Sequence, residues 1–211
     1  MALRLDHFFI LTGTPEPAAD LLRKIGMIEG ASNTHPGQGS ANRRFFCANT
    51  TLELLYLHDV AEAENGPGMQ LGLAQRLEFD QASPFGLIFR TDTDSAAFPA
   101  WAYYPDYLPD GMHFLVGANS ADLPEPLCIC MPDRLQPPAD AAPPENPDWR
   151  LTELRISVPV ARPSETLERI AACPEVSVNP GHPHLLELTF NHQQRGRTHD
   201  FGPCLQLIIR C

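Results

Sequence analysis

The sequence predicts an α+β protein whose repeated β-α-β units form a curved, mixed sheet. Short apolar runs with a period of two recur along the chain, and the order of elements restarts twice. In the first and the last unit, helix signals follow the first strand. One helix per unit covers one face of the sheet, so the other face is free to curve into a concave pocket. Hydrophobic residues make up 43% of the 211 residues and charged residues 19%, which is typical of a globular chain with a buried core.

The first unit covers residues 3–58. A strand over 3–12 is followed by a helix over 14–26, which begins with Thr-Pro and ends at a glycine. A turn-rich stretch then leads to strands over 43–48 and 51–58, joined by a tight connection. The order is β-α-β-β, with room for one more short strand before the last two.

The second unit is looser than the first. Residues 61–79 are polar and then weakly helical, and we expect a connector that packs on the outside and has no chemical role. Strands follow over 85–90, 112–116 and 127–131, with a short helical turn capped by Asp94 after the first of them.

A stretch rich in proline separates the third unit from the rest. Six prolines within sixteen residues favour an extended linker over 132–150. Beyond it we expect a strand over 151–158, a helix over 163–172, and strands over 185–190 and 205–210. The predicted organisation is a first domain over 1–131, the linker over 132–150, and a C-terminal βαββ unit over 151–211 that completes or extends the sheet.

Charge and composition exclude several classes of protein. The net charge is -11, from 26 acidic and 15 basic residues, and Lys24 is the only lysine, so a nucleic-acid partner is not expected. No stretch reaches the roughly 18 apolar residues of a membrane-spanning helix, and the first apolar run carries Asp6 and His7, so it is interpreted as a strand and not as a signal peptide. The G-x-S-x-G, G-x-G-x-x-G, Walker A and H-E-x-x-H patterns are absent.

Six cysteines are scattered among apolar neighbours and never show the C-x-x-C spacing of zinc or redox sites. Without a signal peptide, reduced and buried thiols are expected, and they predict a cytoplasmic protein.

Four short motifs lie along this plan. They are Leu5-Asp6-His7, His35-Pro36-Gly37-x-Gly39-x-Ala41-Asn42, Leu52-Glu53-Leu54 and Pro109-Asp110-Gly111. Together with the leucine-rich third unit, they resemble the glyoxalase-like branch of the vicinal oxygen chelate superfamily, the glyoxalase/bleomycin resistance/dioxygenase group. The resemblance spans residues 3–210 and leaves the linker and the connector unexplained. It implies paired βαβββ modules that form a cupped sheet.

The resemblance also implies a divalent metal in the cup, since many members of the superfamily hold one on the first and last strand of each module. Carried over by position, the ligands would be His7 and Glu53, a pair that suits Zn, Mn, Fe or Ni. Two ligands are too few, and the second unit has no histidine where the next ligand would fall. In the third unit, Glu153 aligns with His7 and Gln206 with Glu53, but glutamine is a weak ligand.

The same residues have purely structural explanations. His7 is then a strand histidine with a hydrogen bond within a partly buried face, and Glu53 is paired with Arg43 or Arg44. The glycines that follow His35 suit an ordinary turn equally well.

A binding role rests on strand alternation. One of Arg43 and Arg44 must point into the cup, where it would hold an anionic substrate, with His35 and Asn42 presenting polar edges. The aromatic residues of 101–107 form a lid over a ligand or simply cover the sheet edge.

Two functional hypotheses follow. In the first, the protein is a metal-dependent lyase, isomerase or dioxygenase acting on a small anionic or carbonyl-bearing molecule, and Glu53 or Glu153 shuttles a proton. In the second, the cup binds such a molecule without metal or catalysis. Homodimers formed by module exchange are common where this fold appears, although three units in one chain could complete the cup alone. The fold selects no reaction, because its members include isomerases, epimerases, dioxygenases and drug-sequestering proteins.

Overall fold

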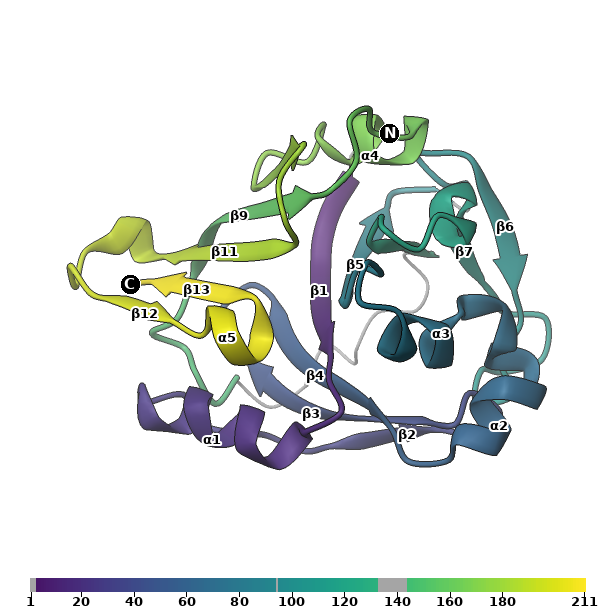
Figure 1. The fold of residues 1–211 in the computed structure, drawn as a ribbon, viewed down its shortest axis with the longest axis horizontal. Helices are drawn as coiled ribbons and strands as arrows, with labels where there is room; N and C mark the ends of the chain where they lie inside the picture. The colour runs from purple at the N-terminus through teal and green to yellow at the C-terminus, as the bar shows by residue number, and fades with distance from the viewer. Residues whose placement is uncertain (1–2, 94, 133–143) are drawn as a thin grey trace.

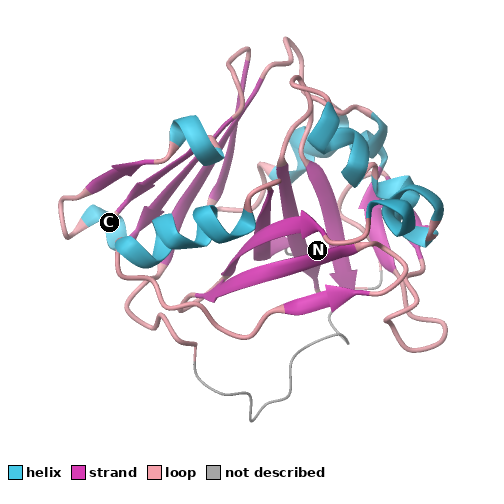
Figure 2. Ribbon diagram, turned by 60° about the horizontal axis from the view of Figure 1, so that its bottom comes forward, coloured by secondary structure: helices cyan, strands magenta, loops and turns pink. Residues whose placement is uncertain are grey.

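The chain folds into two mixed sheets with short helices at their edges (Figures 1 and 2). The structure is a computed structural model that describes residues 3–93, 95–132 and 144–211. The expected Asp94 cap and most of the expected linker therefore lie outside the described residues. No described helix is long and apolar enough to cross a membrane.

The first sheet has eight strands in the order β2-β3-β4-β1-β5-β8-β7-β6. Its bounds are β1 (Leu3–Leu11), β2 (Asn33–His35), β3 (Ser40–Phe46), β4 (Thr51–Leu57), β5 (Phe85–Thr91), β6 (Ala100–Tyr103), β7 (Phe114–Gly117) and β8 (Leu127–Pro132). The pairs β1–β4 and β5–β8 are parallel, and β1 and β5 are antiparallel at the centre. The sheet thus consists of two four-stranded modules. The first module contains the strands from β1 to β4, the second contains those from β5 to β8, and the two modules meet where β1 pairs with β5.

The second sheet repeats this plan on a smaller scale. Its order is β10-β9-β11-β13-β12, where the parallel pairs β9–β10 and β11–β13 meet through antiparallel β9 and β11. Its strands are β9 (Leu151–Val158), β10 (Val176–Pro180), β11 (Leu185–Phe190), β12 (Thr198–Asp200) and β13 (Leu207–Arg210).

The C-terminal unit neither completes nor extends the first sheet, which corrects the expectation from sequence. Its apolar side chains, such as Leu154, Ile156 and Leu188, belong to one core cluster with Phe8, from β1, and its neighbours in the first sheet. Burying one sheet against the other removes more apolar surface from water than adding strands at an edge would.

Short helices and 3-10 turns connect the strands. They are α1 (Pro15–Lys24), α2 (Val60–Asn65), α3 (Leu73–Glu78), α4 (Glu165–Ile170) and α5 (Gly202–Leu205), with 3-10 turns at Pro67–Leu71, Ala118–Ala121 and Asn191–Gln193. The helix α1 buries Ala18, Ala19 and Leu22 in the core between the sheets. The expected strand over 205–210 begins two residues later, because Leu205 ends α5.

The described end of the proline-rich stretch is packed against the fold. Asn146 is 3% exposed, and its side-chain amide bonds both the N–H and the carbonyl of Ile28. Trp149 is also buried, with its ring edge-on to Phe190. Asn146 and Trp149 thus anchor this end of the expected linker to the folded chain.

All six cysteines are free, and five of them are buried. Burial raises the pKa of the Cys47 thiol to about 12 and that of Cys130 to about 11, where the Ala97 backbone partly opposes the shift. These thiols are packing groups at neutral pH.

Candidate functional site

A cavity of about 240 Å³ lies on the concave face of the first sheet and is lined by both modules. The cup is complete within one chain, because the β1–β5 pair joins its two halves. We use the word cup for this cavity. Its polar lining residues are His7, Asn33, His35, Gln38, Asn42, Arg44, Glu53, Tyr103 and Tyr107.

The charged and imidazole groups of the cup all come from the first module. His7 lies on β1, His35 on β2, Arg44 on β3 and Glu53 on β4. Neighbouring positions of paired strands point to the same face, and Arg44 lies directly opposite Glu53 in the β3–β4 register. The five residues His7, His35, Asn42, Arg44 and Glu53, which the sequence singled out, therefore share one cavity.

The second module gives the cup an apolar wall. Ile88 from β5 and Leu127, Ile129 and Met131 from β8 line it, with Phe114 from β7. None of these five side chains carries a charge or a strong hydrogen-bonding group.

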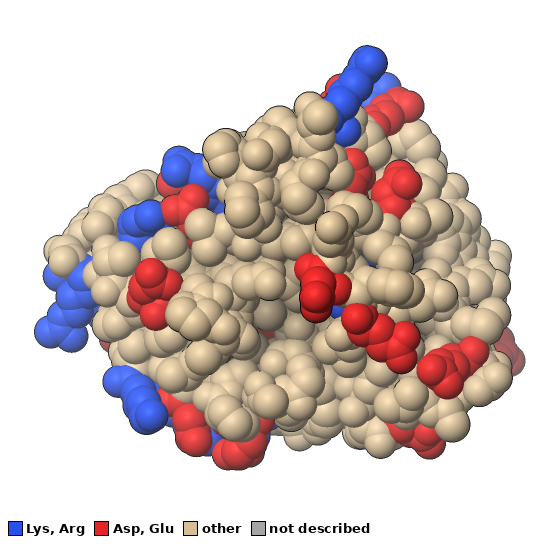
Figure 3. All heavy atoms as spheres, viewed as in Figure 1, with Lys and Arg blue, Asp and Glu red and all other residues tan. Residues whose placement is uncertain are grey.

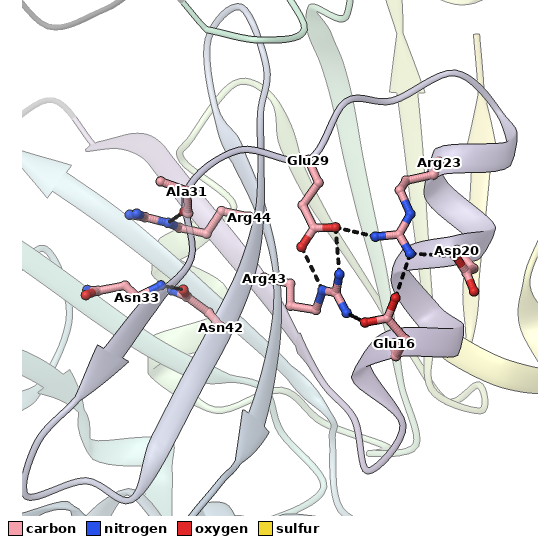
Figure 4. A network of polar contacts seen from close by, with 9 residues as sticks. All are labelled: Glu16, Asp20, Arg23, Glu29, Ala31, Asn33, Asn42, Arg43 and Arg44. Atoms are coloured by element: carbon pink, nitrogen blue, oxygen red, sulfur yellow. Dashed lines mark hydrogen bonds and ion pairs between the residues drawn. The ribbon is translucent and has the colours of Figure 1, made fainter.

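Arg43 and Arg44 point to opposite sides of β3, as strand alternation predicts (Figure 4). Arg43 is directed away from the cup, and its guanidinium binds Glu29 through Nε at 2.7 Å and Nη2 at 2.8 Å, and Glu16 through Nη1. Arg44 lines the cup. Its Nε donates to the carbonyl of Ala31 at 2.6 Å, and its guanidinium lies 4.8 Å from the centre of the Phe46 ring.

These two contacts leave the terminal nitrogens of Arg44 with no hydrogen-bond or ion-pair partner among the described residues. A guanidinium held by its Nε and by a ring face presents its outer fork in a fixed direction. That fork matches the two oxygens of a carboxylate.

Glu53 is 9% exposed and has no hydrogen bond or ion pair within the described part of the chain. The structural explanation, in which Arg43 or Arg44 neutralises it, does not hold, because Arg43 is bound to Glu29 and Arg44 to Ala31. A buried carboxylate without donors is costly unless a ligand supplies them.

His7 is held by its neighbour Asp6. Its Nδ1 lies 2.6 Å from Oδ1 of Asp6, and the other carboxylate oxygen of Asp6 accepts from Nε of Arg90. Burial lowers the pKa of His7, but the charge of Glu53 and the hydrogen bond and charge of Asp6 outweigh it, so the pKa lies above its usual value. A carboxylate on Nδ1 leaves Nε2 to face the cup.

His35 behaves in the opposite way. Its Nδ1 lies 2.9 Å from Oγ of Ser40, and its ring lies 5.4 Å from that of Tyr107. Burial lowers the pKa of His35, and the charge of Glu53 opposes this only in part. The pKa values of the two histidines in the cup are therefore shifted in opposite directions, so His7 holds a proton to a higher pH than His35 does.

Hydrogen bonds that the sequence did not predict connect the two modules across the cup. The amide oxygen of Gln38 accepts from the hydroxyls of Tyr103 at 3.3 Å and Tyr107 at 3.2 Å, which joins the two modules across the cavity. Leu71 and Leu73 of the connector also line the cup. The connector was expected to pack on the outside, but its two buried leucines close one end of the cavity, and only the apolar spacing of residues 71 and 73 could have indicated this.

Glu153 does not join this group. It lies on β9 of the second sheet, where its carboxylate accepts from Arg155 at 2.7 Å and from the Thr189 hydroxyl at 3.4 Å. Gln206 caps α5 in that part of the chain with a left-handed backbone. Neither residue lines the cup.

The residues of the cup do not fit the metal that the resemblance implies. The residue that pairs with His7 across the two modules is Ile88, and the cup-facing residues of β8 are Leu127, Ile129 and Met131. Alkyl side chains are not ligands, and a thioether is a poor ligand for Zn, Mn, Fe(II) or Ni(II). Among the residues that the structure describes, no group of three His, Cys, Asp or Glu is arranged to hold a metal ion.

Solved structures share this architecture. A hypothetical protein from Staphylococcus aureus superposes with a TM-score of 0.58 at 10% identity, covering 99% of each chain. A triple mutant of 4-hydroxymandelate synthase from Streptomyces coelicolor, a vicinal oxygen chelate enzyme, gives a TM-score of 0.53 at 12% identity over 89% of this chain and 70% of its own. The chain has the vicinal oxygen chelate fold. No protein-family model and no curated protein matches it by sequence.

A methylmalonyl-CoA epimerase bound to methylmalonyl-CoA and ammonium, another protein of this fold, is 14% identical and covers 65% of the chain, with a TM-score of 0.43. In this protein the charged residues that line the cup come from the first module, and the residues from β5 and β8 are apolar. At sequence identities of 10–14%, structural similarity shows a shared fold and not a shared function. The function therefore has to be inferred from the residues of the cup.

Proposed function

We propose that the cup binds a small amphipathic molecule with a carboxylate or carbonyl group at one end, without a metal ion. The polar end lies between Arg44, Glu53 and His7, and the apolar body lies against β5 and β8. The observation that carries the proposal is the division of the lining, in which every charged group comes from the first module while β5 and β8 contribute only apolar side chains.

The size and polarity of the cavity support a small ligand. A volume of about 240 Å³ is near the lower end of small-molecule pockets, roughly 300 Å³. Arg44 provides the pair of donors that a carboxylate needs, and the apolar wall favours a ring or a branched chain.

Glu53 favours a second candidate, a proton-transfer enzyme such as an isomerase or lyase. Its buried carboxylate receives no hydrogen bond from any described residue, so it could accept a proton from a bound substrate. Arg44 and the cationic form of His7 would then stabilise the negative charge that develops on a substrate oxygen. Metal-dependent versions of this chemistry are not proposed, because the second module offers no ligand.

A set of three probes tests the binding proposal. Phenylacetate combines both ends of the inferred ligand, phenylacetamide keeps the ring without the charge, and acetate keeps the charge without the ring. We expect phenylacetate to bind more tightly than either, as measured by isothermal titration calorimetry on the full chain. Equal affinity for phenylacetate and phenylacetamide would contradict the role of the polar half.

The variant Arg44→Ala assigns the polar end. We expect it to weaken phenylacetate binding by about 1.5–3 kcal/mol, the usual value of a charged hydrogen bond, and to leave phenylacetamide binding nearly unchanged. Arg43→Ala is the matched control, because this neighbour points away from the cup into the pair with Glu29. For the enzyme candidate, solvent deuterium exchange into the benzylic CH₂ of phenylacetate, lost in Glu53→Gln, is the measurement that would favour catalysis.

A further inference from the structure

A second cavity, of about 380 Å³, lies where the two sheets meet at the start of β1. The first sheet contributes Arg4, Leu5 and Asp6 from β1, Arg90 from β5, and the turn residues Asn49 and Thr50. The second half of the chain contributes Arg150, Leu151 and Glu175. None of these residues lines the cup. This second cavity is called the arginine cavity below.

The arginine cavity is positively charged within an acidic protein. Three guanidinium groups, those of Arg4, Arg90 and Arg150, face two carboxylates, those of Asp6 and Glu175. The whole chain carries a net charge of -11. Three of its fifteen basic residues converge on one concave site, a pattern that favours an anionic ligand.

Arg90 supplies the atom that most needs a partner. Its side chain is 12% exposed, and its Nε is committed to Asp6. Its Nη1 is fully buried and has no hydrogen-bond partner. A charged donor buried without an acceptor is unfavourable, so the arrangement calls for an acceptor.

The remaining polar groups of the walls are already occupied. The Asn49 amide donates to the carbonyl of Leu151 at 3.0 Å and accepts from its N–H at 2.9 Å. The Thr50 hydroxyl donates to the backbone carbonyl of Asp6 at 3.0 Å. These bonds tie the β3–β4 turn to both β1 and β9, so the walls of the cavity are held in place before an anion binds.

We propose that the arginine cavity binds a small oxyanion, either a carboxylate or a phosphate, with the Arg90 guanidinium as its anchor. Arg150 from the second half of the chain faces the same anion, so that binding bridges the two sheets. A carboxylate and a phosphate share the property that matters here, two oxygens that accept from one guanidinium edge.

The test titrates the full chain with inorganic phosphate and with acetate, at an ionic strength held constant by chloride, using isothermal titration calorimetry. We expect saturable binding of one anion per chain. Tighter binding of phosphate identifies a tetrahedral oxyanion, and tighter binding of acetate identifies a carboxylate. Heats that chloride alone reproduces would overturn the proposal.

Four variants locate the site. Arg90→Gln is expected to weaken anion binding at least about tenfold, the equivalent of one charged hydrogen bond. Arg150→Gln removes an exposed side chain that the fold does not need, and it is expected to weaken binding severalfold even if Arg90→Gln perturbs folding. Arg169→Gln, which removes an exposed arginine on α4, is the control for net charge and is expected to change nothing.

Arg44→Gln separates this site from the cup. If the anion binds in the arginine cavity, its affinity survives the loss of the cup guanidinium. Loss of phosphate and acetate binding in Arg44→Gln, with full binding in both Arg90→Gln and Arg150→Gln, would place the anion in the cup and overturn the inference while leaving the proposed function intact.

Discussion

Oδ1 of Asp6 lies 2.6 Å from Nδ1 of His7, although successive residues of a regular strand point to opposite faces. The register between β1 and β5 shifts between Leu5 and His7, so a bulge brings the two side chains together. Asp6 thereby contacts Arg90 in the arginine cavity and His7 in the cup. One carboxylate connects the two sites that we propose.

Asp6→Asn is expected to destabilise the protein in a pH-dependent way. Asp6 and Glu53 raise the pKa of His7 against the effect of burial. The contribution of the His7–Asp6 pair to the free energy of unfolding is therefore complete below 6.5, the ordinary pKa of histidine, and is lost as pH rises through the raised pKa. His7 and Arg90 lower the pKa of Asp6, and burial opposes this effect without cancelling it. The contribution of the Asp6 carboxylate to stability is therefore present above its ordinary pKa of 3.8 and is lost as pH falls through the lowered pKa.

Urea denaturation of the wild type and Asp6→Asn at about pH 5.5 and pH 9 measures this difference. The difference in the free energy of unfolding between the wild type and Asp6→Asn is expected to narrow at pH 9, because neutral His7 no longer forms an ion pair with Asp6. The difference does not vanish, because Arg90 stays charged. Asp20→Asn, which breaks the exposed pair with Arg23, is the control and lacks a histidine. A gap for Asp6→Asn that widens at pH 9 would contradict the assignment.

The hydrogen bonds from Tyr103 and Tyr107 to Gln38 are expected to be energetically coupled. Tyr103→Phe and Tyr107→Phe each remove a hydroxyl that donates to Gln38, so each lowers the free energy of unfolding by about 0.5–1.5 kcal/mol. Each single variant leaves the buried Gln38 oxygen with its other donor, and only the double variant leaves this acceptor without either hydroxyl, so the double variant is expected to lose more than the sum of the two. Thermal or urea unfolding checks this, with Tyr104→Phe as a control, since Tyr104 is 58% exposed. Strict additivity would argue against a shared acceptor.

Leu73→Ala tests the connector as a wall of the cup. Leu73 is 2% exposed, so the truncation is expected to cost about 2–5 kcal/mol and to enlarge the cavity. Affinity should then shift from phenylacetate towards the larger 1-naphthylacetate. Leu77→Ala, the same substitution on the same helix at an exposed position, should stay within about 0.5 kcal/mol and keep the original preference. An unchanged preference in Leu73→Ala would remove α3 from the site.

Much of the polar half of the cup could be predicted because it depends on local alternation. The period of two that defined the strands around His7 and Glu53 also predicted that one of Arg43 and Arg44 faces inward, and in the structure Arg44 is the one that lines the cup. The parallel pairing of β1 with β4 then brings the predicted residues together. The repeat of units, visible as a restart of the order of elements, predicted the paired modules of the first sheet.

What the sequence did not predict depends on contacts between distant segments. The strands β6, β10 and β12 have three to five residues each, too few for a period to be recognised. The separation of the second sheet follows from burial of Leu154 and its neighbours against the first, which no local pattern encodes. Glu153 was assigned to the site by alignment with His7, but it belongs to the second sheet, where it pairs with Arg155.

The apolar wall gives the last prediction, which concerns metal. Since Ile88 and Met131 face the cup from the second module, the wild type is expected to retain no stoichiometric Zn²⁺, Mn²⁺, Fe²⁺ or Ni²⁺ after gel filtration, as measured by elemental analysis. The double variant Ile88→His with Met131→Glu supplies two donors opposite His7 and Glu53 and should retain one ion per chain. Adding His7→Ala to this background should release it. A stoichiometric ion in the wild type that His7→Ala removes would show instead that two ligands and water suffice, and would restore the metal-dependent hypothesis.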